Sequence, residues 1–100
     1  MIVEKNGNKK ERYCREKLEW SILKAIDKRS ISVGKVNEIL TELEYDFSWR
    51  KSITSKEIGA ETLKKLQWVD EVAYIRYASI YQKFEQASDF LEFIHTNLQK

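Results

Sequence analysis

The sequence is poor in cysteine, histidine and proline: its 100 residues include one cysteine, one histidine and no proline. The single cysteine, Cys14, excludes an internal disulfide and a zinc site built from several cysteines. The absence of proline suits a mostly helical chain with tight connections. Because no apolar run approaches the roughly 20 residues of a membrane span and no signal peptide is recognisable, we expect a cytoplasmic protein without a membrane partner.

A strong excess of charge of one sign is also lacking. The chain has 18 basic and 16 acidic residues and a net charge of +2, whereas non-specific nucleic-acid binding usually needs a strongly basic face. The charge is nevertheless uneven, because the segment from Lys5 to Lys17 holds six basic and two acidic residues. Such a cluster is compatible with an anionic ligand, although clusters of this kind are more often solvated surface.

The apolar content indicates a folded chain. Hydrophobic residues make up 42% and aromatic residues 12% of the sequence, which is too much for a disordered segment. We expect residues 1–100 to form a single domain with one modest core, since no linker or repeat divides them.

The chain begins with the pattern of a β-hairpin and continues with helical spacing. Ile2 and Val3 are β-branched, Asn6-Gly7 is a turn signal, and residues 10–13 can return as a second strand. A short strand at Ile53 would extend this hairpin. The apolar positions with helical spacing are Leu18, Trp20, Ile22, Leu23, Ala25 and Ile26; Val36, Ile39, Leu40 and Leu43; Ile58, Leu63 and Leu66; Ala73, Tyr74, Tyr77, Ala78, Tyr81 and Phe84; and Phe90, Leu91, Ile94 and Leu98.

Helix start signals accompany four of these stretches. They are Ser30 or Ser32, the Thr-x-x-Glu capping box of Thr54 and Glu57, Asp70, and Ser88. The expected fold class is therefore α+β and mostly helical. A small β-hairpin or three-stranded sheet would cap a bundle of four to five helices, because an isolated hairpin is marginal in water.

Several segments resemble the ATP-cone family. These are Val3-Glu4-Lys5-Asn6-Gly7, Tyr13-Cys14-Arg15-Glu16-Lys17-Leu18, Ile53-Thr54-Ser55-Lys56-Glu57-Ile58-Gly59 and Asp70-Glu71-Val72-Ala73-Tyr74-Ile75-Arg76-Tyr77-Ala78-Ser79-Ile80-Tyr81, followed by Phe84. The last segment, together with Asp89-Phe90-Leu91-Glu92, is most similar to the cone of the NrdR-type repressors of ribonucleotide reductase. Those regulators also carry a four-cysteine zinc ribbon, which one cysteine cannot build.

The resemblance implies a regulatory domain that is not an enzyme. Its effector would be ATP or dATP, with Mg²⁺ as an optional companion. It would control the assembly or activity of a regulator related to ribonucleotide reductase, and cones of this kind associate, so a homo-oligomer is expected. Direct DNA binding by this chain is not expected, because the zinc ribbon reads DNA in the family.

The resemblance also marks the residues of a nucleotide site. The residues expected at the phosphates are Lys5, Asn6, Lys9, Arg12 and Lys17, with Lys10 as optional help. Asn6 stands where the family has arginine, and the start of the helix beside Lys17 adds partial positive charge. The residues expected around the base and ribose are Val3, Cys14, Leu18, Ile22, Ser55, Ile58 and Gly59.

Two of these positions carry an unusual residue. Gly59 replaces a bulkier family residue, which would leave space for a larger or second nucleotide. Cys14 stands where the family has Asp or Asn, and cysteine is a weak helix cap.

Three other functional classes remain open. The chain has no Gly-x-x-x-x-Gly-Lys-Ser/Thr loop and no paired aspartates for Mg²⁺, which argues against a nucleotide hydrolase or kinase. A helical interaction domain that has lost nucleotide binding is one alternative. Part of a DNA-binding transcriptional repressor is another.

Overall fold

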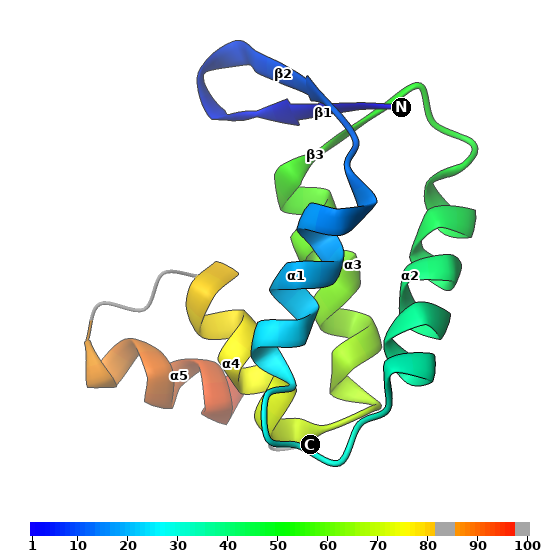
Figure 1. Cartoon of the computed structure of the whole chain (residues 1–100). Helices are drawn as coiled ribbons and strands as arrows, with labels where there is room; N and C mark the ends of the chain where they lie inside the picture. Colours follow the sequence, from blue (N-terminus) through cyan, green and yellow to red (C-terminus); the bar gives the residue numbers. More distant parts are fainter. Residues whose placement is uncertain (82–85, 98–100) are drawn as a thin grey trace.

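A small sheet lies across one end of a bundle of helices (Figure 1). The computed structural model describes residues 1–81 and 86–97, and within these ranges the chain forms three strands and five α-helices. The strands are β1 (Ile2–Lys5), β2 (Lys9–Arg12) and β3 (Ser52–Thr54), and the helices are α1 (Arg15–Ala25), α2 (Val33–Phe47), α3 (Ser55–Gln67), α4 (Glu71–Tyr81) and α5 (Ala87–Asn97). The α+β fold class predicted from the sequence is confirmed.

The sheet has the strand order β2-β1-β3, so the first strand is central. β1 pairs antiparallel with β2 and parallel with β3. The hairpin turn is a single 3-10 turn over Asn6–Asn8, in which Gly7 (φ 77°) and Asn8 (φ 62°) are both left-handed. Glycine and asparagine tolerate this conformation best, which explains the turn signal in the sequence. The second strand starts one residue earlier than predicted, at Lys9.

The register of the hairpin decides which side chains face the helices. Val3 pairs with Glu11, and Lys5 pairs with Lys9. Because side chains alternate along a strand, these four share the face of the sheet on which Val3 is buried against the bundle. Arg12 pairs with Ile2 and lies on the opposite face.

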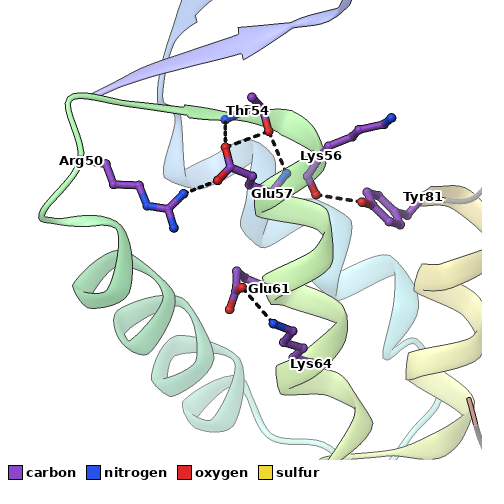
Figure 2. A network of polar contacts seen from close by, with 7 residues as sticks. All are labelled: Arg50, Thr54, Lys56, Glu57, Glu61, Lys64 and Tyr81. Carbon is purple, nitrogen blue, oxygen red and sulfur yellow. Dashed lines mark hydrogen bonds and ion pairs between the residues drawn. The ribbon is translucent and has the colours of Figure 1, made fainter.

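Local capping explains where three helices begin. Ser32 Oγ accepts a hydrogen bond from the Lys35 N–H at 3.0 Å, so Ser32 rather than Ser30 caps α2. Thr54 and Glu57 form the predicted capping box of α3 (Figure 2). Asp70 Oδ2 accepts from the Ala73 N–H at 2.9 Å at the start of α4. These caps satisfy N–H groups that a helix start leaves without an intrahelical partner.

The core lies between α1, α2, α3 and α4, and closes beneath the sheet. α1 packs against α2 and α4, and α3 packs against α4, α2 and the strand β1. Its buried apolar residues are Val3, Leu18, Ile22, Ala25, Ile26, Val36, Ile39, Leu40, Leu43, Phe47, Ile53, Leu63, Leu66, Ala73, Tyr74, Tyr77 and Ala78. Most of these are positions whose spacing predicted them. No helix in the described part of the chain has the length and apolarity needed to cross a bilayer.

Some predicted apolar positions lie elsewhere. Trp20 is 62% exposed and points away from the bundle, because it lies on the face of α1 opposite Leu18 and Ile22. Ser88 does not cap α5, which already begins at Ala87. On α5, Leu91 is 63% exposed. The ring of Phe93 packs instead against Tyr74, with centroids 5.5 Å apart. Phe84 and Leu98 lie outside the described residues.

Candidate functional site

A hollow of about 590 Å³ lies beneath the hairpin, bounded by the first turns of α1 and α3 and the last turns of α4. Two of the three strands and three helices contribute to it, so it forms only when the fold is complete. Its lining consists of Val3, Lys5, Glu11, Tyr13, Cys14, Lys17, Leu18, Ser21, Ser55, Ile58, Gly59, Tyr77, Ile80 and Tyr81. Its size is within the range of small-molecule sites, which is roughly 300–1,000 Å³.

Positive charge is gathered at one wall of this pocket. Lys5 Nζ lies 2.9 Å and Lys17 Nζ 3.3 Å from the same oxygen, Oε1 of Glu11. The hydrogen bond from Lys5 is the largest cause that lowers the pKa of Glu11, and Lys17 acts in the same direction. Glu11 is therefore ionised, and its carboxylate holds the two lysines close together. All three side chains remain substantially exposed to solvent.

The start of α1 lies at the same wall. Cys14 precedes the helix in an extended conformation and makes no side-chain capping bond. Its thiol instead donates to Glu16 Oε2 over 3.3 Å. The Glu16 carboxylate accepts from its own backbone N–H in the first turn, which lowers its pKa, so α1 has a carboxylate rather than Cys14 at its start. The helix adds partial positive charge there.

The rest of the pocket is mainly apolar. Val3 and Leu18 come from β1 and α1, and Ile58 and Ile80 come from α3 and α4. Tyr77 also lines the pocket and is 9% exposed. An apolar chamber beside a pair of lysines combines the two properties that an organic anion with a flat ring requires.

Gly59 does not provide the free space that its small size suggested. A Cβ atom at this position would lie 2.2 Å from Cδ1 and Cε1 of Tyr81, so the tyrosine ring occupies the space over the glycine. The ring is held in place because the Tyr81 hydroxyl donates to the Lys56 carbonyl over 2.8 Å, as Figure 2 shows. Gly59 thus permits close packing of α4 on α3, which corrects the expectation of an open cavity.

Most of the residues predicted for a nucleotide site are brought together here. Those that line the pocket are Val3, Lys5, Cys14, Lys17, Leu18, Ser55, Ile58 and Gly59. Four others are not among the lining residues. Lys9 and Arg12 are exposed, and the register places Arg12 on the far face of the sheet. Ile22 is fully buried in the core. Asn6 lies in the hairpin turn.

Sequence reasoning missed several lining residues. They are Glu11, Tyr13, Ser21, Ile80 and, as pocket rather than core residues, Tyr77 and Tyr81. Glu11 could have been found from the strand register, because it pairs with Val3. Ser21 follows Lys17 by four residues and so shares its side of α1. The three residues on α4 carry no such signal, because their position depends on how α4 packs.

A polar network joins the edge of the pocket to α2. The Tyr13 hydroxyl donates to Glu44 Oε2 over 2.8 Å, and Arg15 pairs with the other oxygen of this carboxylate. Arg15 also donates to Asn37 Oδ1 over 2.6 Å. Burial, reinforced by the bond to Glu44, raises the pKa of Tyr13. The hydroxyl therefore keeps its proton and acts as a donor.

Carboxylates are scarce at the pocket. Glu11 is the one acidic side chain among its described lining residues, and it is already paired with two lysines. Residues 1–81 and 86–97 contain no cluster of three or more metal-ligating side chains. A Mg²⁺ ion at this site would therefore take its ligands chiefly from phosphate oxygens and water.

Comparison with known proteins gives one consistent result. A protein of Caldicellulosiruptor bescii called transcriptional repressor NrdR is 37% identical over 94 residues, which are 92% of this chain and 61% of that protein. Proteins with the same name are 38% identical in Desulforapulum autotrophicum (92% of this chain, 56% of the relative) and 34% identical in Clostridioides difficile (91% and 61%). The chain spans about three fifths of the length of these curated relatives. No family model matches it.

Proposed function

The chain is homologous to the NrdR family of transcriptional repressors over more than nine tenths of its length, and from this premise we propose that it is an ATP-cone that binds ATP or dATP. It would serve as the nucleotide-sensing part of a cytoplasmic regulator related to ribonucleotide reductase. The nucleotide would act as an effector that is bound and released unchanged.

The observation that carries this proposal is the pairing of Lys5 and Lys17 at one wall of an apolar pocket. The two ammonium groups meet on a single carboxylate oxygen, so they can also meet on one phosphate group. The segments that form this end of the molecule, residues 1–17 and 50–57, contain nine basic and four acidic side chains. Residues outside them contain nine basic and twelve acidic side chains, so an anion is favoured at the sheet end.

Binding would exchange one anion for another. Glu11 is paired with both lysines, and its single negative charge leaves one positive charge on the three groups. A triphosphate carries more negative charge than one carboxylate and can also accept hydrogen bonds from the start of α1. The phosphates would thus replace Glu11 as the partner of the lysines, while the adenine ring would enter the apolar part between Val3, Leu18 and Ile58.

Regulation requires that the nucleotide binds one arrangement of the domain better than another. Effectors typically shift such equilibria by about 1–3 kcal/mol. The pocket lies where the hairpin meets three helices, so occupancy can change how these parts pack. We propose that the change is read out as self-association of the chain.

The decisive experiment is calorimetric titration with ATP, dATP, GTP and CTP. We expect binding of the adenine nucleotides in preference to GTP and CTP. The substitution Lys17→Gln should weaken ATP binding by about 10- to 100-fold, which corresponds to loss of one charge-assisted contact. Lys64→Gln is the matched control, because Lys64 is an exposed lysine of α3 paired with Glu61 and outside the pocket lining (Figure 2).

The outcomes distinguish the alternatives. Absence of binding at millimolar nucleotide would favour an interaction domain that has lost its ligand. Release of phosphate from ATP that disappears in the Lys17→Gln variant would identify an enzyme. The relatives are named repressors, and specific binding of this chain to a promoter fragment would show that it contributes to DNA recognition directly.

A further inference from the structure

Tyr13 connects the pocket to α2. Its ring lines the pocket beneath the hairpin, and its hydroxyl bonds to Glu44 on α2 over 2.8 Å. The same residue lines a second hollow of about 460 Å³, which it shares with Glu44 and Phe47. The tyrosine is half-buried and stands between the two hollows. A movement of the Tyr13 ring caused in the pocket beneath the hairpin would therefore also alter the second hollow, beside Glu44.

The joint between β2 and α1 is fastened to α2 at two points. Tyr13 and Arg15 both bond to the Glu44 carboxylate, and Arg15 extends to Asn37. Asn37 and Glu44 are seven residues apart, which places them two turns apart on one face of α2. Cys14, between the two anchoring residues, lines the pocket instead.

The contact between Tyr13 and Glu44 depends on the hydroxyl group of the tyrosine. A phenylalanine ring would fill the same space but could not donate a hydrogen bond. Glu44 is partly buried, with 28% of its side chain exposed. A hydrogen bond to a charged carboxylate in such a place is stronger than one between neutral groups.

We propose that Tyr13 is a positioning residue that transmits occupancy of the pocket to α2 through its hydrogen bond to Glu44. This inference rests on the proposed function, because it requires a ligand between Lys5 and Lys17. A ligand that takes these lysines from Glu11 acts on both strands of the hairpin and on the start of α1. Tyr13 lies directly between β2 and α1, so the displacement passes to Glu44 and from there to α2.

The test compares the variant Tyr13→Phe with the wild-type chain. This substitution removes one hydroxyl and leaves the ring and the Arg15–Glu44 pair in place. Tyr45→Phe is the matched control, because Tyr45 lies on α2, is 67% exposed and is outside the pocket lining. For each protein, the affinity for ATP is measured by calorimetry, and amide hydrogen exchange is measured with and without saturating ATP.

In the wild-type chain we expect ATP to slow amide exchange both at the pocket and in residues 37–44 of α2. In Tyr13→Phe we expect ATP to bind about fivefold more weakly, the usual weight of one such bond, and to protect the pocket without protecting α2. Tyr45→Phe should behave as the wild type does. If Tyr13→Phe does not fold, Glu44→Ala removes the acceptor of both Tyr13 and Arg15 and should likewise abolish the protection of α2 by ATP.

Three results would overturn the inference. The first is protection of the wild-type pocket by ATP with no change in α2, which would leave the proposed function intact. The second is the same α2 response in Tyr13→Phe as in the wild type. The third is failure of ATP to bind the wild-type chain at all, which would refute the proposed function together with the coupling.

Discussion

Replacing Gly59 with alanine would bring a methyl group to 2.2 Å from the ring of Tyr81. Cβ atoms do not approach carbon atoms so closely, so the tyrosine ring must leave its place. It would then lose the hydrogen bond to the Lys56 carbonyl, worth about 1 kcal/mol, and contacts of a half-buried ring, worth about 1 kcal/mol more. Alanine is better than glycine inside a helix by about 1 kcal/mol, which offsets half of this cost.

The net effect predicted for Gly59→Ala is a loss of about 1 kcal/mol in the free energy of unfolding. For a chain of this size this lowers the melting temperature by about 4–8 °C. In the background Tyr81→Ala the ring that the added methyl group would meet is absent. The same substitution should then stabilise the fold by about 1 kcal/mol, so its sign reverses.

Urea unfolding of the wild type, Gly59→Ala, Tyr81→Ala and the double variant measures the effect of Gly59→Ala on stability with and without the tyrosine ring. The predicted coupling between the two positions is about 2 kcal/mol, well above the few tenths expected for independent sites. An equal gain in stability from Gly59→Ala in both backgrounds would refute the close packing of Tyr81 on Gly59. It would also restore the idea that Gly59 leaves room for a ligand.

Three further predictions concern single polar groups. Thr54→Ala removes the side-chain acceptor of the capping box of α3 (Figure 2) and should lower the free energy of unfolding by about 1 kcal/mol in chemical denaturation; an unchanged midpoint would contradict the cap. Glu11→Gln removes the carboxylate that competes with phosphates for Lys5 and Lys17, so calorimetry should show tighter ATP binding, and weaker binding would show that Glu11 itself contacts the nucleotide. Asp70 has a lowered pKa, chiefly because of Arg29 and then the Ala73 N–H. Its contribution to stability is therefore present above about pH 4 and is lost as the pH falls through the pKa of the folded state. Thermal melts should show that the variant Asp70→Asn loses less stability in acid than the wild type, and parallel pH profiles of the two proteins would exclude the effect.

The sequence predicted best those features that near neighbours decide. The capping box of Thr54 and Glu57 involves residues three positions apart, and the structure contains it as expected. Apolar spacing along α2 identified Val36, Leu40 and Leu43, all of which are fully buried. Spacing alone was less reliable at Trp20, since a helix can carry an apolar residue on its outer face without a partner.

The pocket was only partly predictable. Lys5 and Lys17 stood out because of their charge and their resemblance to a family pattern, and both line the hollow. Glu11 escaped notice because its place between them depends on the strand register, which the turn fixes. Arg12 differs from Glu11 by one position and faces the other side of the sheet, so composition alone could not separate their roles.

The α+β class, the order of the elements and most of the core follow from local sequence patterns, because helical spacing and capping are properties of residues close together in the chain. Three contacts depend instead on how the elements pack: Glu11 joins two lysines, Tyr81 covers Gly59 and Tyr13 bonds to Glu44. The last two contacts link residues 22 and 31 positions apart, and the first depends on how the hairpin pairs and sits on α1. Such contacts form only when separate elements pack, and packing geometry is not encoded in any single stretch of sequence.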